Sequence, residues 1–180
     1  MGIDPGLDRT GWAVLEGNGS AGFVLKACGL IHTDLLSPLP VRLDQTYNEI
    51  SKVAQEFQPQ SAAMEEMFFL KRAIRVVQTV QARGVIMLAL HRQGLEIYSY
   101  QPKQVKAVLC GSGTADKKQM QRMVQLTLKL KEKLNPDDVA DAAAIALCHL
   151  KTAPIKTKID LQKKFLEKLK QARSEQIKKI

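Results

Sequence analysis

Four acidic residues stand where their side chains could act together. Asp4 ends a short apolar run immediately before a Pro-Gly turn, and Glu65 lies in a strand-like run over residues 61–68. Asp138 and Asp141 are three residues apart near the start of an alanine-rich helix, so they share one helix face. The residues around these acids are mostly apolar, and unpaired carboxylates in such surroundings repel one another and are costly to desolvate.

A divalent cation would remove that cost. Mg²⁺ binds oxygen ligands and retains several water molecules, which leaves room for a substrate phosphate. Each acid alone has an ordinary explanation, because Asp before Pro-Gly forms turns and an acid at a helix start suits the backbone dipole. Taken together, two strands and a helix could converge at one edge of a sheet, and this convergence indicates a metal site.

The elements that must position the acids follow from the spacing of apolar residues. Apolar runs over 10–15 and 23–31 are separated by Gly17-Asn18-Gly19-Ser20, and with the short first strand they predict an antiparallel meander. The segments that follow are a helix over 39–57, strands over 61–68 and 95–100, and helices over 73–92, 103–110, 116–130 and 136–150. This order predicts an α/β fold with a five-stranded mixed sheet flanked by helices.

The charge is strongly basic but unevenly distributed. The chain has 27 Lys and Arg and 18 Asp and Glu, a formal charge of +9, which predicts a polyanionic partner such as nucleic acid or an acidic membrane surface. Residues 151–180 hold ten Lys and Arg and three Asp and Glu, so this segment carries +7 and residues 1–150 only +2. A body that binds DNA must therefore place its cations locally.

The cysteines and the hydropathy indicate the compartment. Cys28, Cys110 and Cys148 form no CxxC pair and cannot all pair internally, which favours reduced thiols in a cytosol. No signal-peptide pattern stands at the N-terminus, and no segment approaches the roughly 18 consecutive apolar residues of a membrane span. We therefore expect a cytoplasmic protein without a membrane partner.

Five segments resemble the motifs of the RuvC family of Holliday-junction resolvases, the crossover junction endodeoxyribonucleases. In chain order they are GIDPGLDRTGWAV at 2–14, AMEEMFF at 63–69, QARG at 81–84, QPKQVKAVLCGSGTADKKQM at 101–120 and PDDVADAAAIALCH at 136–149. One such motif would be a weak signal, but five in order and at fitting spacing are highly specific.

The resemblance implies an RNase H-like nuclease domain over residues 1–150. Residues 151–180 have no counterpart in it, and their Lys-rich sequence predicts a basic C-terminal tail that is helical or disordered. It implies a structure-selective endonuclease that resolves Holliday junctions in DNA recombination and repair by two symmetric nicks. It also implies two Mg²⁺ ions per active site, for which Mn²⁺ can substitute. The implied partners are four-way junction DNA, a second copy in a homodimer, and a branch-migration motor complex. The implied catalytic and metal-binding acids are Asp4, Glu65, Asp138 and Asp141.

Two of these acids have adjacent alternatives. Neighbouring strand residues point to opposite faces of a sheet, so only one of Glu65 and Glu66 can face the site. The register of the motif favours Glu65. It likewise favours Asp138 over Asp137, because Asp138 shares a helix face with Asp141.

The resemblance also implies contacts with DNA. Lys106 and Lys117 match basic positions near the DNA backbone, where lysines would contact phosphates and make binding depend on salt. Phe68 matches an aromatic position that wedges against junction bases, and stacking on a base contributes about 1–3 kcal/mol. A solvated helix face and a buried Phe are the plain alternatives. The neighbouring candidates are Lys103, Lys118 and Phe69.

Three other interpretations stay open on the sequence. Another RNase H-like nuclease, acting on RNA–DNA hybrids or ribosomal RNA precursors, would share the metal site. A sugar kinase or actin-like ATPase would also begin with a Gly-x-Asp-x-Gly turn, but 180 residues hold only one of the two domains that such proteins need. A junction-binding protein without catalysis is the third, and the presence of all four acids argues against it.

Overall fold

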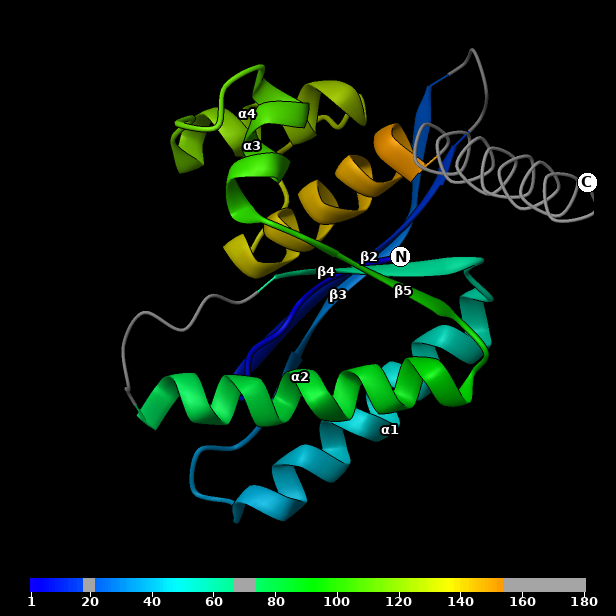
Figure 1. The fold of residues 1–180 in the computed structure, drawn as a ribbon, viewed down its shortest axis with the longest axis vertical. Coiled ribbons are helices and arrows are strands. Elements are labelled where there is room, and N and C mark those ends of the chain that lie inside the picture. Colours follow the sequence, from blue (N-terminus) through cyan, green and yellow to red (C-terminus); the bar gives the residue numbers. More distant parts are fainter. Residues whose placement is uncertain (18–21, 67–73, 154–180) are drawn as a thin grey trace, which may run out of the picture. The chain divides into compact units, whose positions relative to one another are not determined.

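The sheet contains the strands that carry two of the four acids. The computed structural model describes residues 1–17, 22–66 and 74–153. Within these residues, β1 (Gly2–Asp4), β2 (Arg9–Gly17), β3 (Phe23–His32), β4 (Ser61–Glu65) and β5 (Glu96–Tyr100) form one sheet in the order β3-β2-β1-β4-β5 (Figure 1). The pairs β1–β2 and β2–β3 are antiparallel, whereas β4 is parallel to both β1 and β5. The predicted mixed sheet is confirmed.

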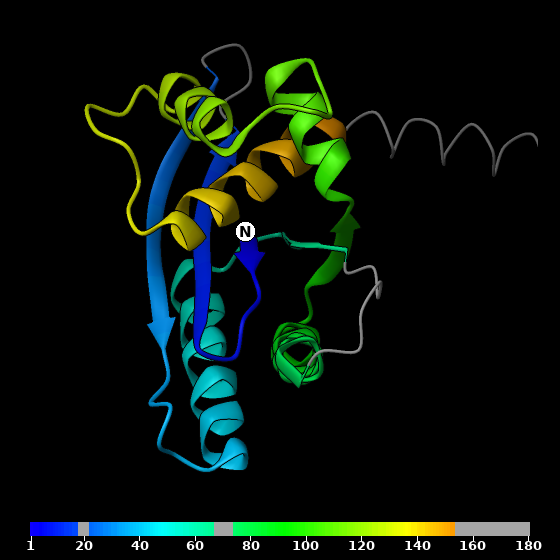
Figure 2. The same cartoon turned by 90° about the vertical axis from the view of Figure 1, so that its left-hand side faces the viewer.

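Helices cover both faces of this sheet. On one face lie α1 (Leu39–Phe57) and α2 (Ile74–Arg92), which pack against each other. On the other face lie α3 (Pro102–Cys110), α4 (Lys117–Thr127) and a helix over residues 137–153, as Figures 1 and 2 show from two directions. The chain is therefore built as three layers around two hydrophobic cores.

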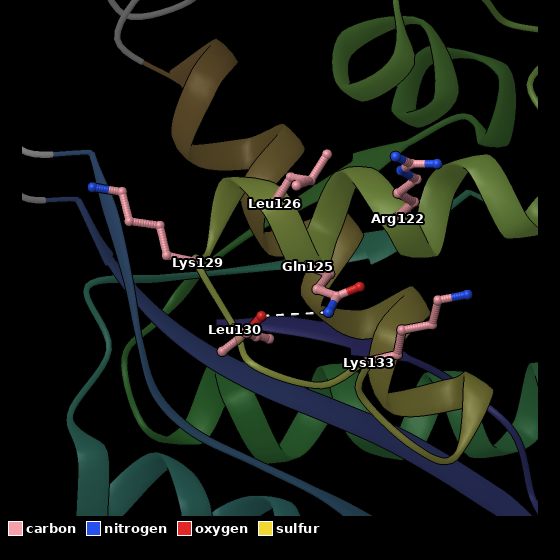
Figure 3. Close-up of a pocket in the computed structure, with 6 residues that line it drawn as sticks. All are labelled: Arg122, Gln125, Leu126, Lys129, Leu130 and Lys133. Atoms are coloured by element: carbon pink, nitrogen blue, oxygen red, sulfur yellow. Dashed lines mark hydrogen bonds between the residues drawn. The ribbon is translucent and has the colours of Figure 1, made fainter.

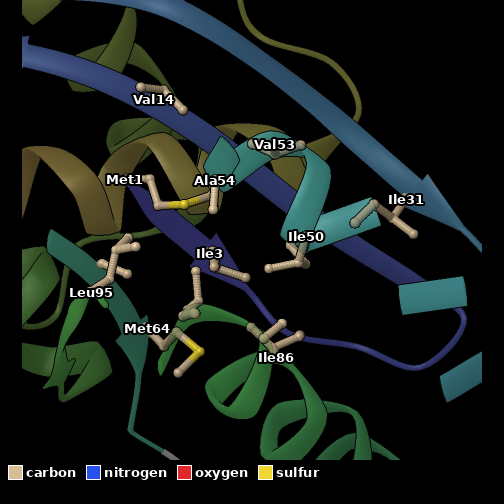
Figure 4. Close-up of a cluster of buried hydrophobic side chains, with 13 residues drawn as sticks. Met1, Ile3, Val14, Ile31, Ile50, Val53, Ala54, Met64, Ile86 and Leu95 are labelled. Carbon is tan, nitrogen blue, oxygen red and sulfur yellow. The ribbon is translucent and has the colours of Figure 1, made fainter. Parts of the chain in front are cut away.

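Successive side chains along a strand point to opposite faces of the sheet, so they pack in two different hydrophobic cores. Ile3 and Met64 are fully buried in the cluster that α1 and α2 cover, where they lie among Ile50 and Ile86 (Figure 4). Ala63, next to Met64 in β4, belongs instead to the cluster on the opposite face. The 137–153 helix supplies six of the 13 buried residues of that second cluster, three of them alanines, and these small side chains let the helix approach the sheet closely.

Two glycines make this close approach possible. A Cβ atom on Gly2 would collide with the carbonyl oxygen of Ala142, and a Cβ on Gly11 would collide with the carbonyl oxygen of Asp138. Neither backbone atom can move without moving the helix. Any side chain at these two positions of β1 and β2 would therefore push away the helix turn that carries Asp138 and Asp141.

A buried histidine joins the same helix to the neighbouring strands. The Nε2 atom of His149 lies 2.7 Å from the Ser61 hydroxyl in β4, and its Nδ1 atom lies 2.8 Å from the Tyr100 hydroxyl in β5. The ring also packs against Tyr98 in a tilted arrangement, at a centroid distance of 4.6 Å. Because buried polar groups without partners are costly, these bonds fix which turn of the helix faces which strand.

Some predicted boundaries were wrong. The strand predicted over 61–68 ends at Glu65, and residues 67–73 lie outside the described part of the chain. The helix predicted over 116–130 ends at Thr127, because Lys129 adopts a left-handed backbone conformation with φ of 53° that cannot continue an α-helix.

Two further predictions remain untested. The pattern of contacts divides the chain into two compact units, Met1–His149 and Leu150–Ile180, but the extent of the nuclease domain and the nature of the tail stay predictions. No helix among the described residues is long and apolar enough to cross a bilayer. The cytoplasmic location likewise stays a prediction.

We expect Gly11→Ala to lower the free energy of unfolding by roughly 1–3 kcal/mol, the usual cost of overpacking. The added methyl group must displace the backbone at Asp138. Urea denaturation of the purified protein measures the change. Gly84→Ala is the matched control, since a Cβ there meets no atom within 4 Å and Ala is favoured in helices. Equal destabilisation by the two variants would contradict the close-packing argument.

Candidate active site

Asp4 and Glu65 lie side by side where two parallel strands end. Asp4 is the last residue of β1 and Glu65 the last of β4, and the register pairs Ile3 with Met64 immediately before them. Residues at matching positions of parallel neighbours point to the same face. The structure therefore brings together the two strand acids that the sequence singled out.

The loop after Asp4 is held in place by two threonines. The Thr10 hydroxyl donates a hydrogen bond to the Gly6 carbonyl at 2.6 Å, and the buried Thr33 hydroxyl donates one to the Leu7 carbonyl at 2.6 Å. The Asp-Pro-Gly turn predicted from the sequence is thus anchored to β2 and to the end of β3, which fixes the backbone direction at Asp4.

The electrostatics of Asp4 show that all four acids are close. The pKa of Asp4 is raised to about 7, first by burial and then by the negative charges of Asp141, Glu65 and Asp138, in that order. The pKa of Glu65 is raised by burial and then by Asp141, whereas Lys106 acts in the opposite direction. Carboxylates that raise one another's pKa have too little positive charge around them.

The two helix acids contact cations. Burial is the largest cause of the raised pKa of Asp141, which Lys117 partly offsets from a distance of 3.3 Å between its Nζ and the carboxylate. Asp138 accepts a short hydrogen bond from the guanidinium of Arg9, at the start of β2. Both acids lie on the helix face that approaches β1 and β2, as the three-residue spacing predicted.

The adjacent alternatives differ from these acids in their surroundings. Asp137 is exposed, lies 3.1 Å from Lys117 Nζ and accepts a 2.7 Å hydrogen bond from Gln121, and these bonds lower its pKa. The backbone N–H of Glu66 donates to the Tyr100 carbonyl, which continues the pairing of β4 with β5 beyond the strand. Neither Glu66 nor Asp137 is among the charges that raise the pKa of Asp4.

The structure describes the predicted DNA-contacting lysines but not the predicted aromatic residues. Lys106 is half-buried and near enough to Glu65 to influence its pKa, and Lys117 bridges two acids of the helix start. Their neighbours Lys103 and Lys118 are exposed. Phe68 and Phe69 lie outside the described residues, so their roles stay predictions.

Sequence reasoning missed Arg9. Its pairing with Asp138 joins residues 129 positions apart, and such a long-range contact has no local signal. The available hint was position alone, because Arg9 lies only three residues after the Asp-Pro-Gly turn, and a cation there is expected to lie near the groups that Asp4 approaches.

The acids provide only oxygen ligands, which is the chemistry that hard divalent cations prefer. Among the described residues, no three His, Cys, Asp or Glu side chains are already gathered as a cage around one point. Instead, Arg9 and Lys117 hold Asp138 and Asp141 in ion pairs. The donor set fits a divalent cation, provided that these carboxylates exchange their cationic partners for the ion.

Comparison with known proteins decides the family. The family model described as "Crossover junction endodeoxyribonuclease RuvC" matches residues 1–149. The chain belongs to the RuvC family. A RuvC of Chloroflexus aggregans is 46% identical over 154 residues, covering 86% of this chain and 93% of the relative.

Solved structures of the family agree with this assignment. A Thermus thermophilus RuvC superimposes with a TM-score of 0.79 at 34% identity, covering 87% of this chain and 95% of that one. A second structure, T. thermophilus RuvC in complex with a Holliday junction substrate, gives a TM-score of 0.82 at 33% identity, covering 87% and 94%. The implied RNase H-like fold is confirmed, and so is an endodeoxyribonuclease that depends on a divalent metal. The kinase-like interpretation is thereby excluded.

The raised pKa of Asp4 predicts that replacing this residue with a neutral one stabilises the metal-free protein, by an amount that depends on pH. The folded state binds the Asp4 proton more tightly than the unfolded state, so the free energy of unfolding falls as pH rises from 3.8 to about 7. In metal-free protein, Asp4→Asn should therefore match the wild type near pH 4. Above pH 7 it should be more stable by up to about 4 kcal/mol.

Denaturant unfolding in EDTA at several pH values measures this difference. Asp137→Asn is the control, because the pKa of that exposed acid is lowered and its neutralisation removes a favourable pairing. A difference between Asp4→Asn and the wild type that stayed constant from pH 4 to pH 8 would refute the crowding of negative charge around Asp4.

Proposed function

We propose that this protein resolves four-way DNA junctions by two symmetric nicks, and that four carboxylates form its catalytic site. The observation that carries the proposal is the convergence of acids from two parallel strand ends and one helix face, with Asp4 responding to the other three. A Thermus thermophilus member of the family is known in complex with a Holliday junction substrate, which supports this DNA as the substrate. The proposed catalytic acids are Asp4, Glu65, Asp138 and Asp141.

The same acids would hold two Mg²⁺ ions, with Mn²⁺ as a substitute. Their all-oxygen chemistry suits hard cations, and the pKa values of Asp4, Glu65 and Asp141 are raised by burial and by neighbouring acids, an electrostatic cost that bound ions would relieve. When bound, such metals activate a water molecule and stabilise the leaving oxygen in phosphodiester hydrolysis.

The chain's own residues would hold the carboxylates in place and neutralise charge on the bound phosphate. Strand ends in the middle of the sheet hold Asp4 and Glu65, so their carboxylates need little reorganisation. Lys117, beside Asp141, lies where it can neutralise charge that develops on a phosphate brought to the acids, and fixed charges of this kind stabilise a transition state. Lys106 would contact a neighbouring phosphate, and Phe68 is proposed to wedge against junction bases.

Two symmetric nicks require two active sites, and a homodimer provides them. The outer face of α2 supports this assembly, because Val77 and Leu88 lie three turns apart on one line of the helix and expose 56% and 51% of their surface, flanked by Met87. An exposed apolar face of this kind would be covered in a dimer. A branch-migration motor complex is proposed as a further partner on family grounds.

Substituting the acids tests the catalytic assignment. Asp4→Asn, Glu65→Gln and Asp141→Asn should each lower the rate of cleavage of a synthetic four-way junction in Mg²⁺ by at least about 1,000-fold, since each removes an oxygen ligand that the chemistry needs. Binding to the junction should persist, as measured by gel shift in Ca²⁺ or EDTA. Glu66→Gln and Asp137→Asn are the matched controls and should retain activity within a few fold.

Two outcomes would count against these assignments. Cleavage at the wild-type rate by Asp4→Asn would refute the catalytic assignment of the acids. Loss of activity in Glu66→Gln but not in Glu65→Gln would show that Glu66, and not Glu65, is the catalytic glutamate. A wild-type protein that cut RNA–DNA hybrids and spared junctions would favour the other RNase H-like nucleases. A wild type that bound junctions without cutting them would favour a non-catalytic role.

Placing a charge on the α2 face tests the dimer. Leu88→Glu should yield a monomer in light scattering after size exclusion, since the proposed interface would have to bury a carboxylate from each copy. A supercoiled plasmid with a cruciform should then give mainly nicked circles instead of linear DNA, because paired cuts are lost. Leu36→Glu, at a residue that is 93% exposed and lies outside α2, is the control. A dimeric Leu88→Glu would exclude this face.

A further inference from the structure

A basic groove lies along the C-terminal half of α4 and the turn that follows it. Its volume is about 660 Å³. Three of the residues that line it are cations and none is acidic (Figure 3). The lining residues are Arg122, Gln125, Leu126, Lys129, Leu130 and Lys133.

The cations of this groove have no acidic partner in the part of the chain that the structure describes. Arg122, Lys129 and Lys133 are all exposed and take part in no ion pair there. Lys117, at the start of the same helix, instead contacts two aspartates. Glu132 is next to Lys133 in sequence but does not line the groove. The positive charge is thus available to an anion.

The backbone of the groove is fixed before any ligand arrives. The buried side chains of Val124 and Leu128 anchor α4 to the core. The Gln125 side-chain amide donates to the carbonyls of Leu130 at 3.4 Å and Lys131 at 3.2 Å, and the Leu130 N–H donates to the Gln125 carbonyl at 3.0 Å. Binding therefore need not order this turn, which reduces its entropic cost.

These bonds also limit what the groove can recognise. The Gln125 amide is the lining group best suited to read a base edge, and it is already engaged with the turn. The remaining polar groups are the three cations, which contact phosphates without regard to sequence. In Figure 3, Arg122 and Lys133 extend toward one side of the view and Lys129 toward the other, so a strand rather than a point charge would satisfy them.

The groove lies a short distance along α4 from the acids. Lys117, which contacts Asp141, is five residues before Arg122 and twelve before Lys129. At about 1.5 Å per residue, these separations span at most about 8 and 18 Å along the helix direction. One strand of B-DNA has a phosphate about every 3.4 Å along the axis, so the span corresponds to roughly two to five nucleotides.

We propose that this groove binds the phosphate backbone of a junction arm, two to five nucleotides from the scissile phosphate. The proposal rests on the proposed function and adds a second contact outside the acid site. The groove would secure an arm of any sequence, through Arg122, Lys129 and Lys133.

Removing the three cations tests the groove. The variant Arg122→Gln/Lys129→Gln/Lys133→Gln should bind a four-way junction at least tenfold more weakly at moderate salt. The slope of its plot of log affinity against log salt concentration should become less negative by about two to three, the change expected when three phosphate contacts are lost. Cleavage at saturating enzyme should stay within a few fold of wild type, because the acids are untouched.

A matched variant controls for net charge. The variant Lys26→Gln/Lys52→Gln/Arg92→Gln also removes three positive charges, from β3, α1 and the end of α2. It should leave the salt dependence at the wild-type value. Equal loss of affinity in both triple variants would mean that only overall charge matters, and would overturn the groove. An unchanged salt dependence in the groove variant would overturn it as well.

Neutral methylphosphonate linkages in the DNA provide a second test that keeps the wild-type protein. Placed two to five nucleotides from the nick, they should weaken wild-type binding by several fold and leave the groove variant unaffected. Equal effects on both proteins would contradict the contact. A wild-type protein that neither bound nor cut the unmodified junction would instead show that the proposed function itself is wrong.

Discussion

Repulsion among carboxylates is the constraint on which the site depends. Asp4 is half-buried beside three other acids, and its pKa is raised to about 7 first by that burial and then by the negative charges of Asp141, Glu65 and Asp138. Free side chains would separate to avoid this repulsion. Here β1 is paired on both sides by β2 and β4, so the backbone at Asp4 cannot retreat. Arg9 and Lys117 supply counter-charge at Asp138 and Asp141.

The helix that carries two of the acids is held to the sheet by shape as much as by charge. Gly2 and Gly11 leave no room between the strands and the helix backbone at Ala142 and Asp138. His149, three turns further along, bonds to β4 and β5 and fixes the rotation of the helix. This packing therefore constrains where Asp138 and Asp141 lie relative to the strands.

Local patterns predicted the acids and the mixed sheet, because each depends on neighbours in sequence. The pleat of a strand separates Glu65 from Glu66, and a helix turn places Asp138 with Asp141. The contact of Arg9 with Asp138 and the two contacts of Lys117 were not predictable in this way, since only the folded chain brings those residues together. The early end of α4 likewise depends on Lys129, whose left-handed conformation is stabilised by the turn around it.

The acid site also explains why local cations matter more than net charge. Four carboxylates repel a DNA phosphate as they repel one another, so a polyanion approaches them only where other groups hold it. The body of the chain has a net charge of only +2, and Arg9 and Lys117 are already paired with acids. The cations of the proposed groove on α4 have no acidic partner among the described residues, so they would offset this repulsion by binding the DNA backbone outside the acid site.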